Sequence, residues 1–88
     1  MSVLFNYRRF YQDLDAKRKQ RNVSWNKLGA RAGVAESSVH RFVRQFEDPE
    51  QYPETRGFNT EVLVSLAHWM GQYDLKRYLT DEDGKPLN

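Results

Sequence analysis

One segment of the chain carries a polar and an apolar set of side chains, each at the spacing of a helix face. The polar set is Ser37, His40, Arg41 and Arg44, and the apolar set is Val39, Phe42, Val43 and Phe46. A helix with this pattern can bury its apolar stripe and present the polar one to a partner. Hydroxyl, imidazole and guanidinium groups donate hydrogen bonds, and the guanidinium groups are permanently cationic. The polar stripe therefore suits an anionic partner with hydrogen-bond acceptors, such as a nucleic acid.

A shorter helix is predicted directly before that segment. Ser24 can cap it, and its apolar or small side chains share one face: Trp25, Leu28, Gly29 and Ala32. Gly33 then ends the helix, because glycine adopts a positive φ without strain from a Cβ atom. Two short helices joined by a tight turn with glycine form a helix-turn-helix, here over about residues 24–46. We expect Gly29 to lie where the two helices cross and their backbones approach closely.

Three further helices complete an expected all-α fold of five helices, with no convincing strand pattern before the tail. The five helices are predicted at about residues 6–20, 25–32, 36–46, 60–70 and 73–79. The buried stripes of the first and fourth are Tyr7, Phe10, Tyr11 and Leu14, and Leu63, Leu66, Ala67 and Met70. Residues 1–79 then form one compact domain. For the acidic tail, residues 80–88, we favour disorder or a loose extended segment over a hairpin or an exchanged arm.

Charge and composition narrow the class of function. The net charge is only +2, but residues 1–46 carry +7 and residues 47–88 carry −5, so one half suits a polyanion. The chain has no cysteine, and His40 and His68 lack metal-ligand spacing, so neither a metal nor a cofactor is expected. Neither a glycine-rich phosphate loop nor a nucleophile elbow is present, which argues against an enzyme. With neither a signal peptide nor a membrane span in view, we expect a cytoplasmic protein.

The motif WNKLGARAGVAESSVHRFVR, residues 25–44, resembles the helix-turn-helix of the phage repressor and Cro family, which has the lambda-repressor-like fold. The segment GFNTEVLVSLAHWMG, residues 57–71, is similar to that family's fourth helix, and the likeness extends over about residues 7–79. It implies a homodimer that binds double-stranded DNA in a bacterial host and represses transcription by occupying an operator. The alternatives are an antitoxin or co-regulator whose main partner is a protein, and an excisionase-like architectural DNA binder.

The resemblance also implies roles for individual residues. The base-reading positions are Glu36, Ser37, His40 and Arg41, and the phosphate-binding positions are Ser24, Trp25, Asn26, Lys27, Arg44 and Arg56. Arg41 suits a bidentate contact with guanine, or a phosphate contact. Glu36 either accepts a hydrogen bond from cytosine or stabilises the helix dipole. Trp25 either donates its indole N–H to a phosphate or belongs to the core.

Two other features bear on partners and on the family pattern. A partner surface, preferably for a homodimer, is predicted from four residues outside the main stripes: Val62, Trp69, Tyr73 and Tyr78. Arg18 matches a position where the family pairs an arginine with a glutamate of the third helix, but here the partner position is Val43. Glu47, one turn further on, is a candidate substitute for that glutamate.

Overall fold

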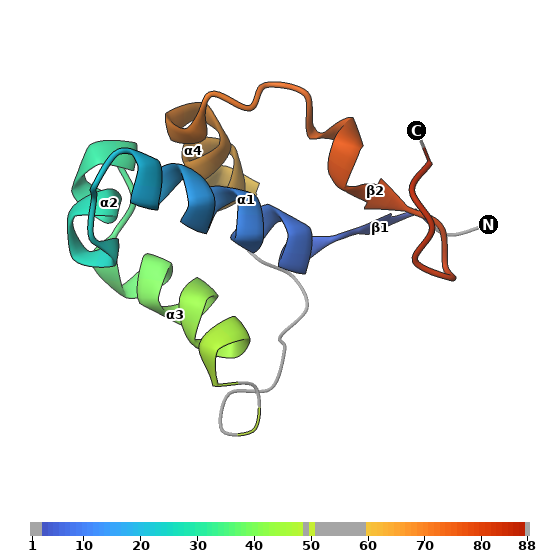
Figure 1. Ribbon diagram of the computed structural model, residues 1–88, viewed down its shortest axis with the longest axis horizontal. Helices are drawn as coiled ribbons and strands as arrows, with labels where there is room; N and C mark the ends of the chain where they lie inside the picture. Colours follow the sequence, from blue (N-terminus) through green and yellow to red (C-terminus); the bar gives the residue numbers. More distant parts are fainter. Residues whose placement is uncertain (1–2, 49, 51–59, 88) are drawn as a thin grey trace.

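The computed structural model describes residues 3–48, 50 and 60–87 (Figure 1). Its elements in chain order are β1 (Leu4–Phe5), α1 (Tyr7–Gln20), α2 (Trp25–Ala32), α3 (Glu36–Glu47), α4 (Thr60–Met70), a single 3₁₀ turn η1 (Leu75–Tyr78) and β2 (Leu79–Thr80). The mainly helical fold is confirmed, but the described residues form four α-helices rather than five. Among the described helices, none is both long and apolar enough to cross a membrane.

The expected fifth helix is wrong because the chain leaves the helical path to form a small sheet. Asp74 caps η1 through the backbone N–H of Lys76, and the turn lasts only four residues. The antiparallel strands β1 and β2 then pair with Leu4 opposite Thr80 and Phe5 opposite Leu79. The backbone N–H of Asn6 donates to the carbonyl of Tyr78 at 2.6 Å, which continues this register into the start of α1. Strand pairing thus joins the two ends of the described chain.

The tail is folded, which corrects the expected disorder. Thr80 forms a bridge with Pro86, and the backbone N–H of Leu87 donates to the carbonyl of Leu79 at 3.2 Å. Between them the chain turns through Gly84, whose φ of +83° is the left-handed conformation that glycine allows. Residues 79–87 therefore form a hairpin, the conformation that the Asp83-Gly84 pair can support.

The core lies between the four helices and the sheet. Its buried apolar side chains from α1, α2 and α3 include Phe10, Leu14, Leu28, Val39, Phe42 and Val43. The predicted stripe of α4 is confirmed, because Leu63, Leu66, Ala67 and Met70 are all buried. Tyr78 is the largest fully buried side chain, with its ring centroid 5.6 Å from that of Phe5 and 5.2 Å from that of Phe10. It therefore fastens the sheet to α1.

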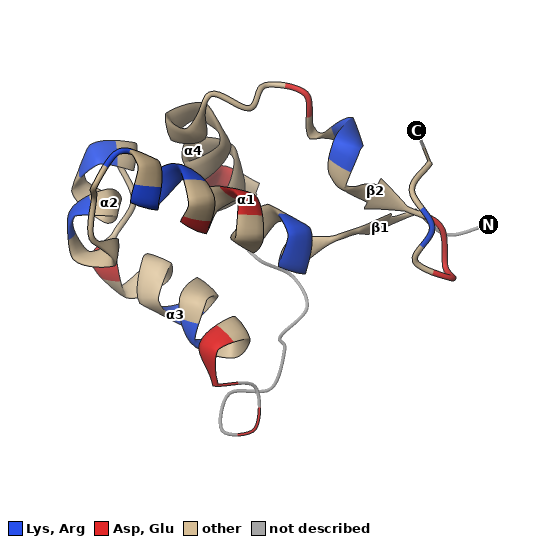
Figure 2. Ribbon diagram, in the orientation of Figure 1, with Lys and Arg blue, Asp and Glu red and all other residues tan. Residues whose placement is uncertain are grey.

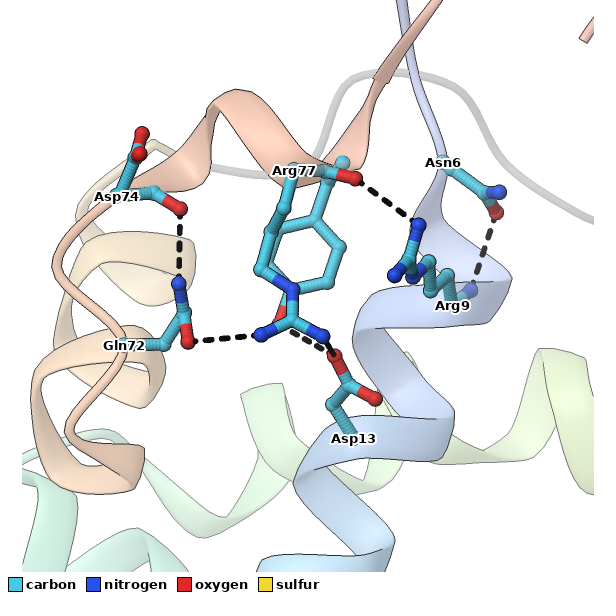
Figure 3. Close-up of polar contacts among 7 residues, drawn as sticks. Asn6, Arg9, Asp13, Gln72, Asp74 and Arg77 are labelled. Atoms are coloured by element: carbon cyan, nitrogen blue, oxygen red, sulfur yellow. Dashed lines mark hydrogen bonds and ion pairs between the residues drawn. The ribbon is translucent and has the colours of Figure 1, made fainter. Parts of the chain in front are cut away.

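A polar cluster completes the attachment of η1 to α1 (Figure 3). The hydroxyl of Tyr78 donates to the Oδ2 atom of Asp13 at 2.7 Å. The guanidinium of Arg77 lies between Gln72 and Asp13, with its Nη2 atom 3.4 Å from Oδ2 of Asp13. Burial, reinforced by the hydrogen bond to Asp13, raises the pKa of the Tyr78 phenol above its usual value.

Candidate nucleic-acid interface

The helix-turn-helix is formed by α2, a short turn and α3. Gly33 ends α2 with a φ of +76°, and the backbone N–H of Val34 donates to the carbonyl of Gly29 at 2.8 Å. A Cβ atom on Gly29 would lie 2.8 Å from the carbonyl oxygen of Val34 and 3.4 Å from the Cα atom of Glu36. The expectations for both glycines are confirmed: Gly33 supplies the turn, and Gly29 permits close contact between α2 and the start of α3.

The two predicted stripes of α3 separate as expected. Val39, Phe42 and Val43 are buried, and Phe46 packs half-buried against the core. The polar side chains Glu36, Ser37, Arg41 and Arg44 are exposed, and His40 is half-buried. The burial of one stripe fixes the orientation of α3, so the other stripe must face outward.

His40 connects the first turns of the two helices. Its Nε2 atom lies 2.8 Å from Oδ1 of Asn26 in α2 and 3.4 Å from Oε1 of Glu36 in α3. A proton on this nitrogen can be donated to either oxygen. The sequence predicts all three residues as DNA contacts, and the structure brings them together as one group. Their side chains also place the amino end of α2 beside the amino end of α3, on one face of the molecule.

The amino end of α2 borders a basic groove. The Ser24 side chain caps the helix by accepting a hydrogen bond from the backbone N–H of Lys27, as predicted. A groove of about 450 Å³ beside this cap is lined by Arg18, Lys19, Asn22, Val23, Ser24 and Lys27. Three cationic side chains therefore lie next to a helix end whose backbone dipole also favours an anion.

Trp25 is packed rather than free at this surface. Its ring stacks on Tyr11 at a centroid distance of 5.8 Å, and the guanidinium of Arg18 lies 4.5 Å from the centroid of the Trp25 ring. Tyr11 in turn stacks on Phe46 at 4.8 Å. This arrangement favours the core interpretation of Trp25. The sequence alone does not connect Trp25 with Tyr11, because the two rings belong to different helices.

The prediction that Glu47 replaces the family's glutamate as the ion-pair partner of Arg18 is wrong. The guanidinium of Arg18 pairs with Asp15 of its own helix at 2.7 Å and donates to the carbonyl of Val23, rather than reaching Glu47. Burial raises the pKa of Asp15, but hydrogen bonds from Arg18 and Lys19 outweigh that effect and hold this pKa below its usual value. The Asp15–Arg18 pair thus keeps Arg18 against Trp25 at the start of α2.

The distribution of charge follows the division expected from the sequence. Figure 2 shows Lys and Arg on α1, α2 and α3, whereas α3 ends on an acidic residue. That residue is Glu47, and it is followed by Asp48. Arg56, the remaining predicted phosphate contact, lies outside the described residues.

No family model, curated protein or solved structure matches this chain. The likeness of the motif to the phage repressor and Cro family therefore stays a prediction.

The predicted partner surface needs one correction. Tyr78 is completely buried, so it is not part of an exposed patch. Val62 and Trp69 are partly buried against the core, and Arg21 lies over the Trp69 ring at 4.7 Å. Tyr73 is 77% exposed. Val64 of α4 is 50% exposed but was not among the four residues predicted for this surface.

Proposed function

We propose that the chain binds double-stranded DNA by placing α3 in the major groove, and that it represses transcription by occupying an operator, as a Cro-like protein would. One observation carries the proposal: the outward polar stripe of α3 and the capped amino end of α2 share one face, where His40 and Asn26 meet at 2.8 Å. An exposed helix face beside a basic helix end is the arrangement by which helix-turn-helix proteins combine base contacts with phosphate contacts.

Arg41 is the best placed of the candidate base readers. Its side chain is exposed, and it has no ion-pair partner among the residues that the structure describes. It can therefore approach the O6 and N7 atoms of a guanine without first breaking an internal contact. Glu36 and His40 differ, because they already contact each other, with Nε2 of His40 3.4 Å from Oε1 of Glu36. We assign base reading mainly to Arg41 and Ser37, and a supporting role to His40.

Phosphate binding is assigned to the amino end of α2 and to Arg44 of α3. The exposed side chains of Ser24, Asn26 and Lys27 surround the amino end of α2, where orphan backbone N–H groups favour a phosphate. Arg44 lies two residues beyond Phe42 on the exposed side of α3 and suits a second backbone contact. The negative charge of Glu36 would repel phosphates, and its proximity to His40 reduces that cost when the imidazole is protonated.

Selection of bound sequences from random DNA tests this function with the wild type and Arg41→Ala. We expect the wild type to enrich a defined site, and Arg41→Ala to lose the preference at one base pair per half-site. The loss should correspond to about 1–3 kcal/mol, the range of a bidentate arginine–guanine contact. A uniform loss of affinity over all sequences would identify Arg41 as a phosphate contact. If the wild type enriches no sequence, the proposed function is wrong.

A further inference from the structure

Among the residues that the structure describes, no strand pairs with the outer edge of β1. In an antiparallel pair the backbone groups of successive residues point alternately toward and away from the neighbouring strand. Asn6 donates to the carbonyl of Tyr78, so Asn6 and Leu4 face β2, whereas Val3 and Phe5 direct their N–H and C=O groups to the opposite side. Within the described residues, β2 is the neighbour of β1 and the segment at Pro86 covers the far side of β2. The outer edge of β1 is thus available for pairing.

Apolar side chains lie at this open edge. Val3 is 59% exposed and Leu4 is 47% exposed, and they account for two of the five large hydrophobic side chains that are exposed in the described structure. Natural sheets usually protect an edge strand with charges, a proline or a covering element. An unprotected apolar edge favours the addition of another strand.

We propose that β1 pairs with β1 of a second copy of this chain, antiparallel about a two-fold axis through Leu4. Pairing of this kind makes Val3 of each copy exchange backbone hydrogen bonds with Phe5 of the other. Leu4 then lies opposite the Leu4 of the second copy, with their Cα atoms about 4.5 Å apart, as in a non-hydrogen-bonded antiparallel pair. The two small sheets become one continuous sheet, and the exposed apolar side chains cover one another.

Charge complementarity is the reason for choosing a second copy as the occupant. The hairpin turn beside β2 contains Asp81, Glu82 and Asp83, whereas α1 begins with Arg8 and Arg9 directly after the sheet. In the two-fold arrangement, the acidic turn of one copy lies at the level of the first turn of α1 in the other, two strand spacings or about 10 Å away. Unlike charges at that separation attract each other at low ionic strength, where the Debye length exceeds about 10 Å. The contact occurs twice in the dimer, because the symmetry repeats it.

The predicted dimer is compatible with the proposed function and deepens it. The sheet and the α2–α3 pair lie toward opposite ends of the long dimension in Figure 1, so pairing at β1 leaves α3 exposed in both copies. Two recognition helices can then read a palindromic site. This consequence for DNA rests on the proposed function, but the association itself does not. Because β1 contributes only two residues, the interface is small, and we expect a dimer that forms in a concentration-dependent way.

The first test is the molar mass of the full chain in solution without DNA, measured by analytical ultracentrifugation over a concentration series. The wild type should shift from monomer to dimer as its concentration rises. Leu4→Lys should stay monomeric, because two like charges would face each other at the axis. Val64→Lys is the matched control, since Val64 on α4 is exposed to nearly the same extent, 50% against 47%. It should dimerise like the wild type. Circular dichroism verifies that both variants are folded.

A cysteine cross-link locates the axis. The chain contains no cysteine, so a single introduced thiol reports on one position. The expected Cα separation of about 4.5 Å at Leu4 falls within the range that a disulfide bridges. Mild oxidation should therefore convert Leu4→Cys to a covalent dimer, while Val64→Cys stays a monomer.

Charge reversal tests the choice of partner. Arg8→Glu and Asp83→Arg should each weaken self-association, because each variant repels its own copy at both contacts. An equimolar mixture of the two variants should associate more strongly than either variant alone. In the mixed dimer, one contact keeps the native pair of Arg8 and Asp83. At the other contact both charges are reversed, so the two side chains again attract each other.

The inference is overturned if the wild type is monomeric at every concentration, if Leu4→Lys associates normally, or if Val64→Lys and Val64→Cys are the variants that respond. The last result would place the interface on α4. A dimer that enriches no DNA sequence would contradict the proposed function alone, and a monomer that enriches one would contradict the dimer alone.

Discussion

At the scale of single residues, Gly29 and His40 determine how α2 and α3 fit together. Gly29 leaves room for the carbonyl of Val34, which lies 2.8 Å from where a Cβ atom would stand. His40 then ties the same two helices together at their amino ends through Asn26 and Glu36. The close approach at Gly29 and the polar contact at His40 both join α2 to α3, so the geometry of the helix-turn-helix depends on both.

We expect Gly29→Ala to destabilise the protein, although alanine favours helices over glycine by about 1 kcal/mol. The carbonyl of Val34 belongs to the backbone and cannot rotate away as a side-chain atom would, so α2 and α3 must separate. Urea denaturation should show a net loss of about 1–3 kcal/mol in the free energy of unfolding. Gly33→Asn is the control, because it lies in open space and asparagine tolerates a positive φ. A Gly29→Ala protein as stable as the wild type would contradict the close contact.

At the scale of elements, α1 supports the amino end of α2. Tyr11 and Arg18 both lie against the Trp25 ring, and Asp15 holds Arg18 in place. The start of α2 is thereby fixed on a rigid helix, and the basic groove beside Ser24 has a defined shape. A phosphate bound there would meet charges and N–H groups already in position, which lowers the entropic cost of binding.

Lys27→Ala should weaken binding to all DNA sequences by a similar factor. Lys27 is exposed at the amino end of α2, where we assign a phosphate contact. Loss of one such contact should make the slope of log K against log salt shallower by about one unit. Lys85→Ala removes the same charge from the tail hairpin, away from α2 and α3, and should leave the slope unchanged. Equal effects of the two substitutions would show that net charge, rather than position, governs binding.

Local patterns predicted the elements that depend on neighbouring residues. The cap at Ser24, the end of α2 at Gly33 and the buried stripe of α4 all follow from short-range chemistry. The sheet could not be predicted in this way, because β1 and β2 are two residues each and lie at opposite ends of the chain. Helical spacing from Tyr73 to Leu79 was visible, but pairing with β1 overrides it after one turn.

The site was predictable in composition but not in its internal contacts. Spacing on one helix identified the outward stripe of α3, and it also suggested that Glu36 and His40 share a face. It could not reveal that His40 meets Asn26, fourteen residues earlier, because that contact requires the crossing of two helices. For the same reason, Trp25 had two open interpretations until the position of Tyr11 was known.

At the scale of the whole molecule, Tyr78 holds the two ends of the described chain together. Its ring lies against Phe5 and Phe10, and its hydroxyl donates to Asp13 of α1. The sheet that we propose as a dimer surface therefore depends on this side chain. Loss of the hydroxyl removes one hydrogen bond to a carboxylate while keeping the ring in place.

Tyr78→Phe should lower the free energy of unfolding near neutral pH by about 1.5–3 kcal/mol, the usual contribution of a hydrogen bond to a charged group. The pKa of Tyr78 is raised in the folded state by burial and by Asp13, so the folded protein holds this proton more tightly than the unfolded chain. The contribution is fully present below the unfolded pKa of about 10 and declines as the pH rises above it. Urea denaturation from pH 7 to 11 should therefore show the wild type and Tyr78→Phe converging above about pH 10.

Tyr73→Phe makes the same chemical change at a side chain that is 77% exposed, and it should match the wild type throughout. A constant difference between wild type and Tyr78→Phe over the whole range would mean that the folded and unfolded states ionise this phenol alike, contrary to its burial against Asp13.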